Sequence, residues 1–312
     1  MKNNDLYIYS FYRFLSIENK KSVKNQLDEY LKKRLLRGTI LLANEGINAS
    51  ISGTENDLLD TIKIIKKILR IRKLNIKINR NKFLPFNRMK VRLKKEIVSL
   101  GKGKIDVEKL TGNLIHPAKW NNTIQKKDVK LIDTRNIYEI NIGRFKGAIN
   151  PKTNSFREFP RKLKEMGIKK NEKLAIYCTG GIRCEKASAY LRLSGFKDVV
   201  QLDGGILNYL NYINENKKKS LWNGDCFVFD NRVTVNKKLE KGEYAQCYGC
   251  RQPLTGLELK SKFYEKGVSC PKCYQSKSLD QKNRSLTRQK QINQHELTKN
   301  NHVFKKIIST DF

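Results

Sequence analysis

The segment around Cys178 places a cysteine where its thiol can be activated. Apolar and β-branched residues over Lys173–Tyr177 predict a buried strand, and a glycine-bearing turn and a predicted helix follow Cys178. Backbone N–H groups and the positive end of the helix then surround the sulfur, which lowers the pKa of the thiol. We therefore expect Cys178 to be a nucleophilic thiolate or to carry a persulfide.

The loop after Cys178 is the predicted cradle for this sulfur. Its two adjacent glycines let the backbone curl inward where a side chain would clash. A tyrosine-phosphatase cradle needs one more residue than the four that separate Cys178 from Arg183, so the spacing excludes a phosphatase. The cradle residues are Thr179, Gly180, Gly181, Ile182 and Arg183.

Three further side chains allow a structural interpretation. Cys184 could resolve a persulfide on Cys178 or could pack in the first turn of the helix, and we favour packing. Arg183 could pair with a phosphate or a sulfur anion, or it could cap the loop, and the sequence does not separate the two roles. Cys226 lies in an apolar stretch, where we expect a buried, unreactive thiol.

Four further cysteines form two C-x-x-C pairs with 19 residues between the pairs. Four thiolates in such turns can surround a tetrahedral Zn²⁺. A metal enclosed in this way has no open coordination position, so its role would be structural. The alternative is a reduced, metal-free pair of turns. The predicted zinc ligands are Cys247, Cys250, Cys270 and Cys273.

The hydrophobic pattern indicates which elements position these residues. Residues 1–110 follow the order β-α-β-β-α-β, which is typical of the ferredoxin-like split βαβ fold. From residue 129 onward strands and helices alternate, which indicates a parallel sheet covered by helices. We expect the boundary between these two domains within residues 105–122.

Composition and charge limit the partners and the compartment. The 312 residues carry a net charge of +35, a field that attracts polyanions such as RNA, although a chain merely rich in Lys and Asn would carry the same charge. Seven cysteines, an odd number, argue against a disulfide framework. No apolar run approaches the roughly 20 residues of a membrane span, and the first residues lack the apolar core of a signal peptide. We expect a cytoplasmic protein with no membrane partner.

Several segments resemble a rhodanese domain, which would span residues 123–217. In rhodaneses the six-residue loop that matches residues 178–183 holds a cysteine persulfide. Asp133 and Arg135 would fix the sheet and its loops by an ion pair, so we interpret both as structural. The segments that carry the resemblance are residues 131–135, Glu139, residues 147–150 and the loop that starts at Cys178.

The similarity extends beyond one domain. Residues 43–48, 150–159, 178–188 and 226–230 together are similar to the bacterial rhodanese-containing tRNA uridine hydroxylases. This resemblance implies an oxidoreductase that uses molecular oxygen to convert the wobble uridine, position 34 of certain tRNAs, to 5-hydroxyuridine. It places the active cysteine at Cys178 and makes the anticodon loop of tRNA the partner, with no DNA partner expected.

The sequence does not identify an electron donor for such a reaction. It has no G-x-G-x-x-G segment, and His116, His295 and His302 form no obvious histidine–carboxylate set for iron. Two other functions fit parts of the chain. The cysteine loop alone would suit a persulfide sulfurtransferase that acts on a small acceptor, and the charge alone would suit a non-catalytic RNA-binding protein.

The sequence therefore predicts an α/β and α+β multidomain protein. The expected parts are a ferredoxin-like domain over residues 1–110, a rhodanese domain over 123–217, a small cysteine-rich zinc module over 220–276, and a basic, weakly ordered tail over 277–312.

Overall fold

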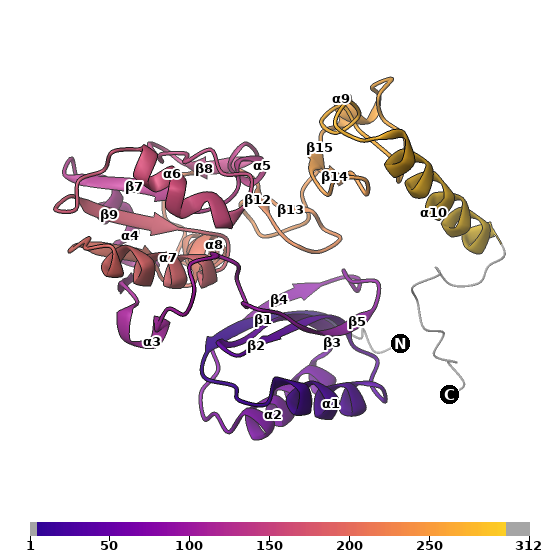
Figure 1. The fold of residues 1–312 in the computed structure, drawn as a ribbon, viewed down its shortest axis with the longest axis horizontal. Coiled ribbons are helices and arrows are strands. Elements are labelled where there is room, and N and C mark those ends of the chain that lie inside the picture. Colours follow the sequence, from indigo (N-terminus) through magenta and orange to yellow (C-terminus); the bar gives the residue numbers. More distant parts are fainter. Residues whose placement is uncertain (1–4, 298–312) are drawn as a thin grey trace.

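The computed structural model describes residues 5–297, and it contains an N-terminal α+β domain, a central α/β domain and a C-terminal cysteine-rich module (Figure 1). The N-terminal domain lies beneath the central one in this view, and the C-terminal module extends to one side. Within the described range, none of the helices is both long and apolar enough to cross a bilayer. His302 and the last part of the predicted tail lie outside the described residues.

The N-terminal domain is a sheet in the order β4-β1-β3-β2-β5, with two helices packed on one face (Figure 1). The order β4-β1-β3-β2 is the one that the predicted β-α-β-β-α-β pattern produces, and β5 is added parallel to β2 at the edge. The elements are β1 (Leu6–Phe14), α1 (Lys20–Leu31), β2 (Arg37–Ala43), β3 (Gly46–Thr54), α2 (Glu55–Leu69), β4 (Ile76–Asn81) and β5 (Met89–Leu93).

The central domain is a parallel sheet in the order β6-β10-β9-β7 with a core on each face. Leu174 and Ile176 of β9 face α6 and α7, and the alternate residues Ala175 and Tyr177 face α4 and α8. The elements are α3 (Val107–Leu110), β6 (Asn113–Ile115), α4 (Pro117–Ile124), β7 (Val129–Asp133), α5 (Ile137–Ile140), β8 (Gly143–Phe145), η1 (Phe156–Glu158), α6 (Phe159–Glu165), β9 (Lys173–Tyr177), α7 (Ile182–Leu193), β10 (Val199–Leu202), α8 (Gly205–Glu215) and β11 (Trp222–Gly224).

The central domain is longer at both ends than the predicted range 123–217. Strand β6 joins the sheet ten residues earlier, and its three residues are too few and too exposed to show as an apolar run. At the other end β11 pairs with β8, and Trp222 and Cys226 are buried in the same core as Trp120. Residues 220–235 therefore belong to the central domain rather than to the cysteine-rich module.

The C-terminal module has a core made largely of cysteine side chains. The first part of the predicted tail forms helix α10. Ser278 and Gln281 each accept a hydrogen bond from the other's backbone N–H and so cap the start of this helix. The polar composition concealed this cap. The remaining elements are β12 (Cys226–Phe227), β13 (Thr234–Val235), β14 (Ala245–Gln246), β15 (Pro253–Leu254), α9 (Gly256–Leu259) and α10 (Leu279–Leu297).

Candidate active site at the cysteine loop

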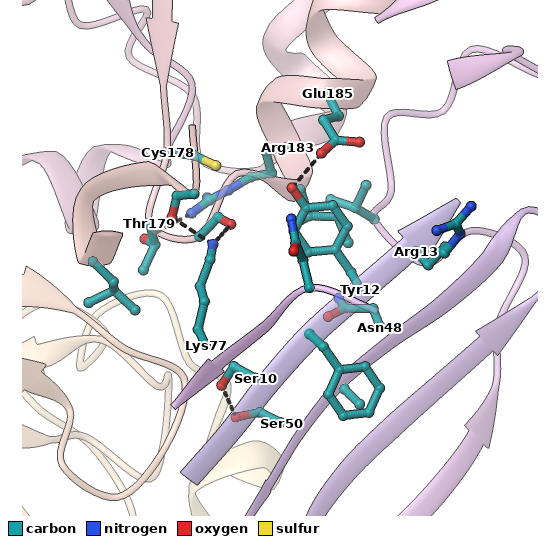
Figure 2. Close-up of a pocket in the computed structure, with 18 of the residues that line it drawn as sticks. Ser10, Tyr12, Arg13, Asn48, Ser50, Lys77, Cys178, Thr179, Arg183 and Glu185 are labelled. Carbon is teal, nitrogen blue, oxygen red and sulfur yellow. Dashed lines mark hydrogen bonds between the residues drawn. The ribbon is translucent and has the colours of Figure 1, made fainter. Parts of the chain in front are cut away.

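Cys178 lies at the end of β9, just before the turn into α7, and its side chain is fully buried (Figure 2). The backbone N–H of Gly181 donates a hydrogen bond to the sulfur at 3.1 Å. Burial by itself raises the pKa of this thiol, but hydrogen bonds from Cys184 and Gly181 and the charge of Arg183 outweigh it and lower the pKa to about 5. The lowered pKa and the position of the sulfur at a strand–turn–helix junction make Cys178 the candidate nucleophile of the site.

The loop requires glycine where the neighbouring backbones approach. Gly181 has φ +99°, and a Cβ there would lie 2.7 Å from the hydroxyl oxygen of Tyr12. Gly205, at the start of α8, has φ +70°, and its Cβ would lie 2.5 Å from the carbonyl oxygen of Cys178. Side chains at these two positions would push apart the segments that hold the sulfur.

Arg183 caps the loop in this structure. Its guanidinium forms a two-point ion pair with Glu139 of α5 at 2.6 and 2.7 Å, and both side chains are buried. Burial raises the pKa of Glu139, but the charge and hydrogen bonds of Arg183 outweigh this and lower it. The same carboxylate accepts a hydrogen bond from Thr179 at 3.4 Å. The described geometry thus corresponds to the capping role rather than to anion binding.

Cys184 is fully buried in the first turn of α7. Its sulfur lies 3.6 Å from the hydroxyl oxygen of Thr134, and burial raises its pKa well above the usual value. Cys184 therefore remains a thiol and can donate its hydrogen to the Cys178 thiolate. Cys184 thus packs in the first turn of the helix, and a role as resolving thiol stays a prediction.

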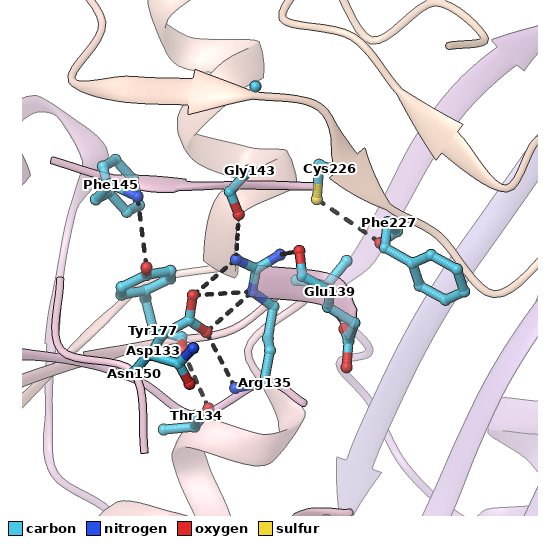
Figure 3. A network of polar contacts seen from close by, with 12 residues as sticks. Asp133, Thr134, Arg135, Glu139, Gly143, Phe145, Asn150, Tyr177, Cys226 and Phe227 are labelled. Carbon is cyan, nitrogen blue, oxygen red and sulfur yellow. Dashed lines mark hydrogen bonds and ion pairs between the residues drawn. The ribbon is translucent and has the colours of Figure 1, made fainter. Parts of the chain in front are cut away.

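A buried polar network fixes the sheet behind the loop (Figure 3). The guanidinium of Arg135 donates to both carboxylate oxygens of Asp133, at 2.9 and 2.7 Å, and to the carbonyl oxygen of Gly143 at 2.6 Å. Neither charged side chain is exposed. Both residues are buried, and their ion pair holds the sheet and its loops together, which is the structural role expected from the sequence.

The N-terminal domain completes the site (Figure 2). Lys77 of β4 donates hydrogen bonds to the carbonyl oxygens of Gly180 and Gly204, the latter at 2.6 Å, and burial lowers its pKa. Tyr12 of β1 donates to the carboxylate of Glu185 at 2.6 Å. Between the two domains lies a cavity of about 830 Å³ that Cys178 lines.

Comparisons with known proteins agree with this division of the chain. Residues 6–97 match the UPF0176 acylphosphatase-like domain, and residues 116–212 match the rhodanese-like domain. A tRNA uridine(34) hydroxylase of Pelagibacter ubique is 48% identical over 300 residues, which is 96% of this chain and 98% of that protein. The chain belongs to the tRNA uridine(34) hydroxylase family.

Two similar solved structures each cover about a third of this chain. A rhodanese-like domain protein from Staphylococcus aureus is 28% identical, with a TM-score of 0.27, over 31% of this chain and 90% of its own. A rhodanese-related protein from Thermoplasma volcanium is 25% identical, with a TM-score of 0.28, over 32% of this chain and 92% of its own.

Four cysteines of the C-terminal module lie close enough together to hold one metal ion. The sulfur atoms of Cys247, Cys250, Cys270 and Cys273 all lie within 4.8 Å of one another. Three of the pairs are 3.8 to 4.0 Å apart. A tetrahedral metal with bonds of about 2.3 Å to sulfur requires spacings of about 3.8 Å, so the arrangement fits such a site.

The structure brings the predicted cradle together but adds residues that sequence reasoning missed. Thr179, Gly180, Ile182 and Arg183 line the same cavity as Cys178, whereas the four metal-binding cysteines form a separate site. Tyr12 and Lys77 are distant in sequence from Cys178 and carry no motif of their own. Glu139 and Glu185 lie in segments that carry the family resemblance, but the sequence assigned no role to either side chain.

Proposed function

We propose that this protein hydroxylates uridine 34 of tRNA at C5 of the uracil ring and so produces 5-hydroxyuridine. The observation that carries the proposal is the Cys178 thiolate at a cavity of about 830 Å³, in a chain 48% identical over 96% of its length to a tRNA uridine(34) hydroxylase. A cavity of this volume is within the usual range for small-molecule sites and has room for one unstacked nucleotide.

Molecular oxygen is the proposed source of the new hydroxyl group. One oxygen atom enters the C5–H bond of the uracil, and the other leaves as water. The reduction to water takes two electrons and two protons, which come from a two-electron reductant that is not part of this chain. Cys178, as a thiolate or as a persulfide, is the redox-active side chain among the described residues that line the cavity. Glu185 and Tyr12, hydrogen-bonded at 2.6 Å, can hold or move a proton there.

The proposed partner is the anticodon loop of tRNA rather than DNA. The net charge of +35 attracts the phosphate backbone, and an anticodon loop presents unstacked bases that a protein can take into a cavity. We place the reaction in the cytoplasm, where tRNA is abundant and the seven free cysteines remain reduced.

A labelling experiment tests this function. Cells that lack the gene are grown under ¹⁸O₂ with or without a plasmid copy, and the nucleosides of their tRNA are analysed by mass spectrometry. We expect 5-hydroxyuridine to disappear without the gene, to return with it, and to carry the heavy isotope. Unchanged 5-hydroxyuridine in the deletion strain would contradict the hydroxylase function. If the purified protein then transfers persulfide sulfur to cyanide, the sulfurtransferase alternative takes its place.

We also propose that the metal held by Cys247, Cys250, Cys270 and Cys273 is zinc with a structural role. Four thiolates suit Zn²⁺, and they leave no coordination position for a substrate. The small cysteine-rich core of this module has few other apolar contacts, so metal binding would supply much of its folding free energy.

A further inference from the structure

Phe229 presents an aromatic ring to solvent beside the site. Its side chain is 65% exposed, whereas Phe227, two residues earlier, is 2% exposed. Phe229 also lines the cavity that contains Cys178. It belongs to the segment 226–230 that marks the family resemblance, yet nothing in the site described so far uses it. An exposed aromatic side chain beside a reactive thiolate can provide a binding surface.

The ring is held in place on two sides. The guanidinium carbon of Arg183 lies over it, 5.8 Å from the ring centroid, and Arg183 is itself held by Glu139. The Phe227 ring contacts it edge to face, with centroids 5.1 Å apart and an interplanar angle of 84°. One face of the Phe229 ring is therefore covered by Arg183 of the cysteine loop, and the rest of the ring is open to solvent.

The loop that carries Phe229 is also held in place. Arg232 forms a buried two-point ion pair with Asp230, at 2.9 and 2.7 Å. The backbone N–H of Val228 donates to the carbonyl of Val233, and that of Asn231 donates to the carbonyl of Pro85 in the N-terminal domain. Because the loop is fixed to both domains, the ring needs little ordering when a ligand arrives.

We propose that Phe229 is a stacking platform for the unpaired base at position 34 as that base enters the cavity. This inference rests on the proposed function, and it names the residue on which the base of the substrate would stack. An aromatic face with a cation behind it suits a flat, polar ring that is attached to phosphate, and the charge of +35 favours RNA over an apolar protein segment.

The test measures binding of a fluorescent anticodon stem–loop RNA to the full chain by anisotropy. Phe229→Ala is expected to weaken binding roughly 5- to 150-fold, the range that follows from loss of one stacked base. Phe229→Tyr keeps the ring and is expected to bind within about 3-fold of the parent. The matched control is Leu193→Ala, which removes a side chain that is 57% exposed on α7 and does not line the cavity.

A second RNA identifies the base. When position 34 is made abasic, binding to the parent protein should weaken, and binding to Phe229→Ala should weaken no further, because the two changes remove the same contact. Equal binding by Phe229→Ala and the parent, or full additivity of the two losses, would overturn the platform. These results are distinct from failure of the proposed function, in which the parent protein would not restore 5-hydroxyuridine in cells.

Discussion

The central residue of this protein is a thiolate that is stable although it is buried. Taking the Cys178 sulfur out of water disfavours its charge, and the pKa falls to about 5 only because the Cys184 thiol, the Gly181 N–H and the Arg183 cation all face it. The arrangement makes the sulfur nucleophilic and oxidisable at neutral pH. The reactivity of this sulfur therefore depends on the groups that the loop places around it, because an ordinary cysteine has a much higher pKa.

Alkylation by iodoacetamide should report this thiolate directly. The folded-state pKa is depressed, so the thiolate fraction should stay near its maximum from about pH 8 down to pH 6 and fall about tenfold per pH unit below pH 5. The rate at Cys178 is followed by mass spectrometry of its peptide. Cys226, whose pKa burial raises to about 12, is the internal comparison and should react slowly throughout. A Cys178 rate that rises tenfold per unit up to pH 8 would contradict the assignment.

The residues of the loop were predictable, but their partners were not. Cys178 and its two glycines follow from a strand, a tight turn and a helix in immediate succession, which is a local pattern. Lys77 binds the loop from the N-terminal domain, and a lone Lys looks the same in sequence whether it is buried or solvated. Glu139 is part of the rhodanese resemblance, but its ion pair with Arg183 is not predictable from the sequence. Long-range contacts of this kind need the fold to be known first.

At the scale of elements, one buried lysine ties α7 to the N-terminal domain. Lys186 is fully buried and donates to Glu45 at 2.7 and 2.8 Å, to Glu96 at 2.6 Å and to the carbonyl of Val98 at 3.1 Å. Glu45 follows β2, and Glu96 follows β5. The helix that starts at the cysteine loop is thus fixed to the domain that forms the other wall of the cavity.

Removal of this lysine should destabilise the protein strongly. Lys186→Met leaves two carboxylates without their cation, and we expect a loss of about 3 kcal/mol in the free energy of unfolding. Urea denaturation followed by the fluorescence of Trp120 and Trp222, both in the central core, measures it. Lys63→Met, which breaks an exposed pair with Asp60, should change stability by less than about 0.5 kcal/mol. Equal effects of the two variants would contradict a role for the buried cluster.

The four cysteines of the C-terminal module should bind zinc in the purified protein. Purified protein should contain about one zinc per chain, because the four sulfur atoms can satisfy one tetrahedral ion. Cys247→Ser should lower the zinc content and the solubility, whereas Cys178→Ser, outside the cluster, should leave both unchanged. The zinc content of each protein is measured by mass spectrometry. The zinc site would be contradicted if the parent contained no zinc, or if Cys247→Ser contained as much zinc as the parent.

At the scale of the whole molecule, the cavity belongs to neither domain alone. The rhodanese-like domain supplies the thiolate, and the N-terminal domain supplies Tyr12 and Lys77 across the gap. The periodic patterns predicted each domain because they record local geometry and burial. They could not predict the docking of the domains, which depends on Lys186 and its carboxylates, nor the pairing of β11 with β8 in the central domain.

The dependence of the reaction on Cys178 can be tested in cells that lack the gene. They are complemented with the parent protein, Cys178→Ser or Cys184→Ser, at equal protein levels, and the nucleosides of their tRNA are analysed by mass spectrometry. We expect that the parent and Cys184→Ser restore 5-hydroxyuridine and that Cys178→Ser does not, because Cys178 is the one cysteine among the described residues that lines the cavity. Restoration by Cys178→Ser at the level of the parent would contradict a catalytic role of Cys178, since the reaction would then not depend on this sulfur.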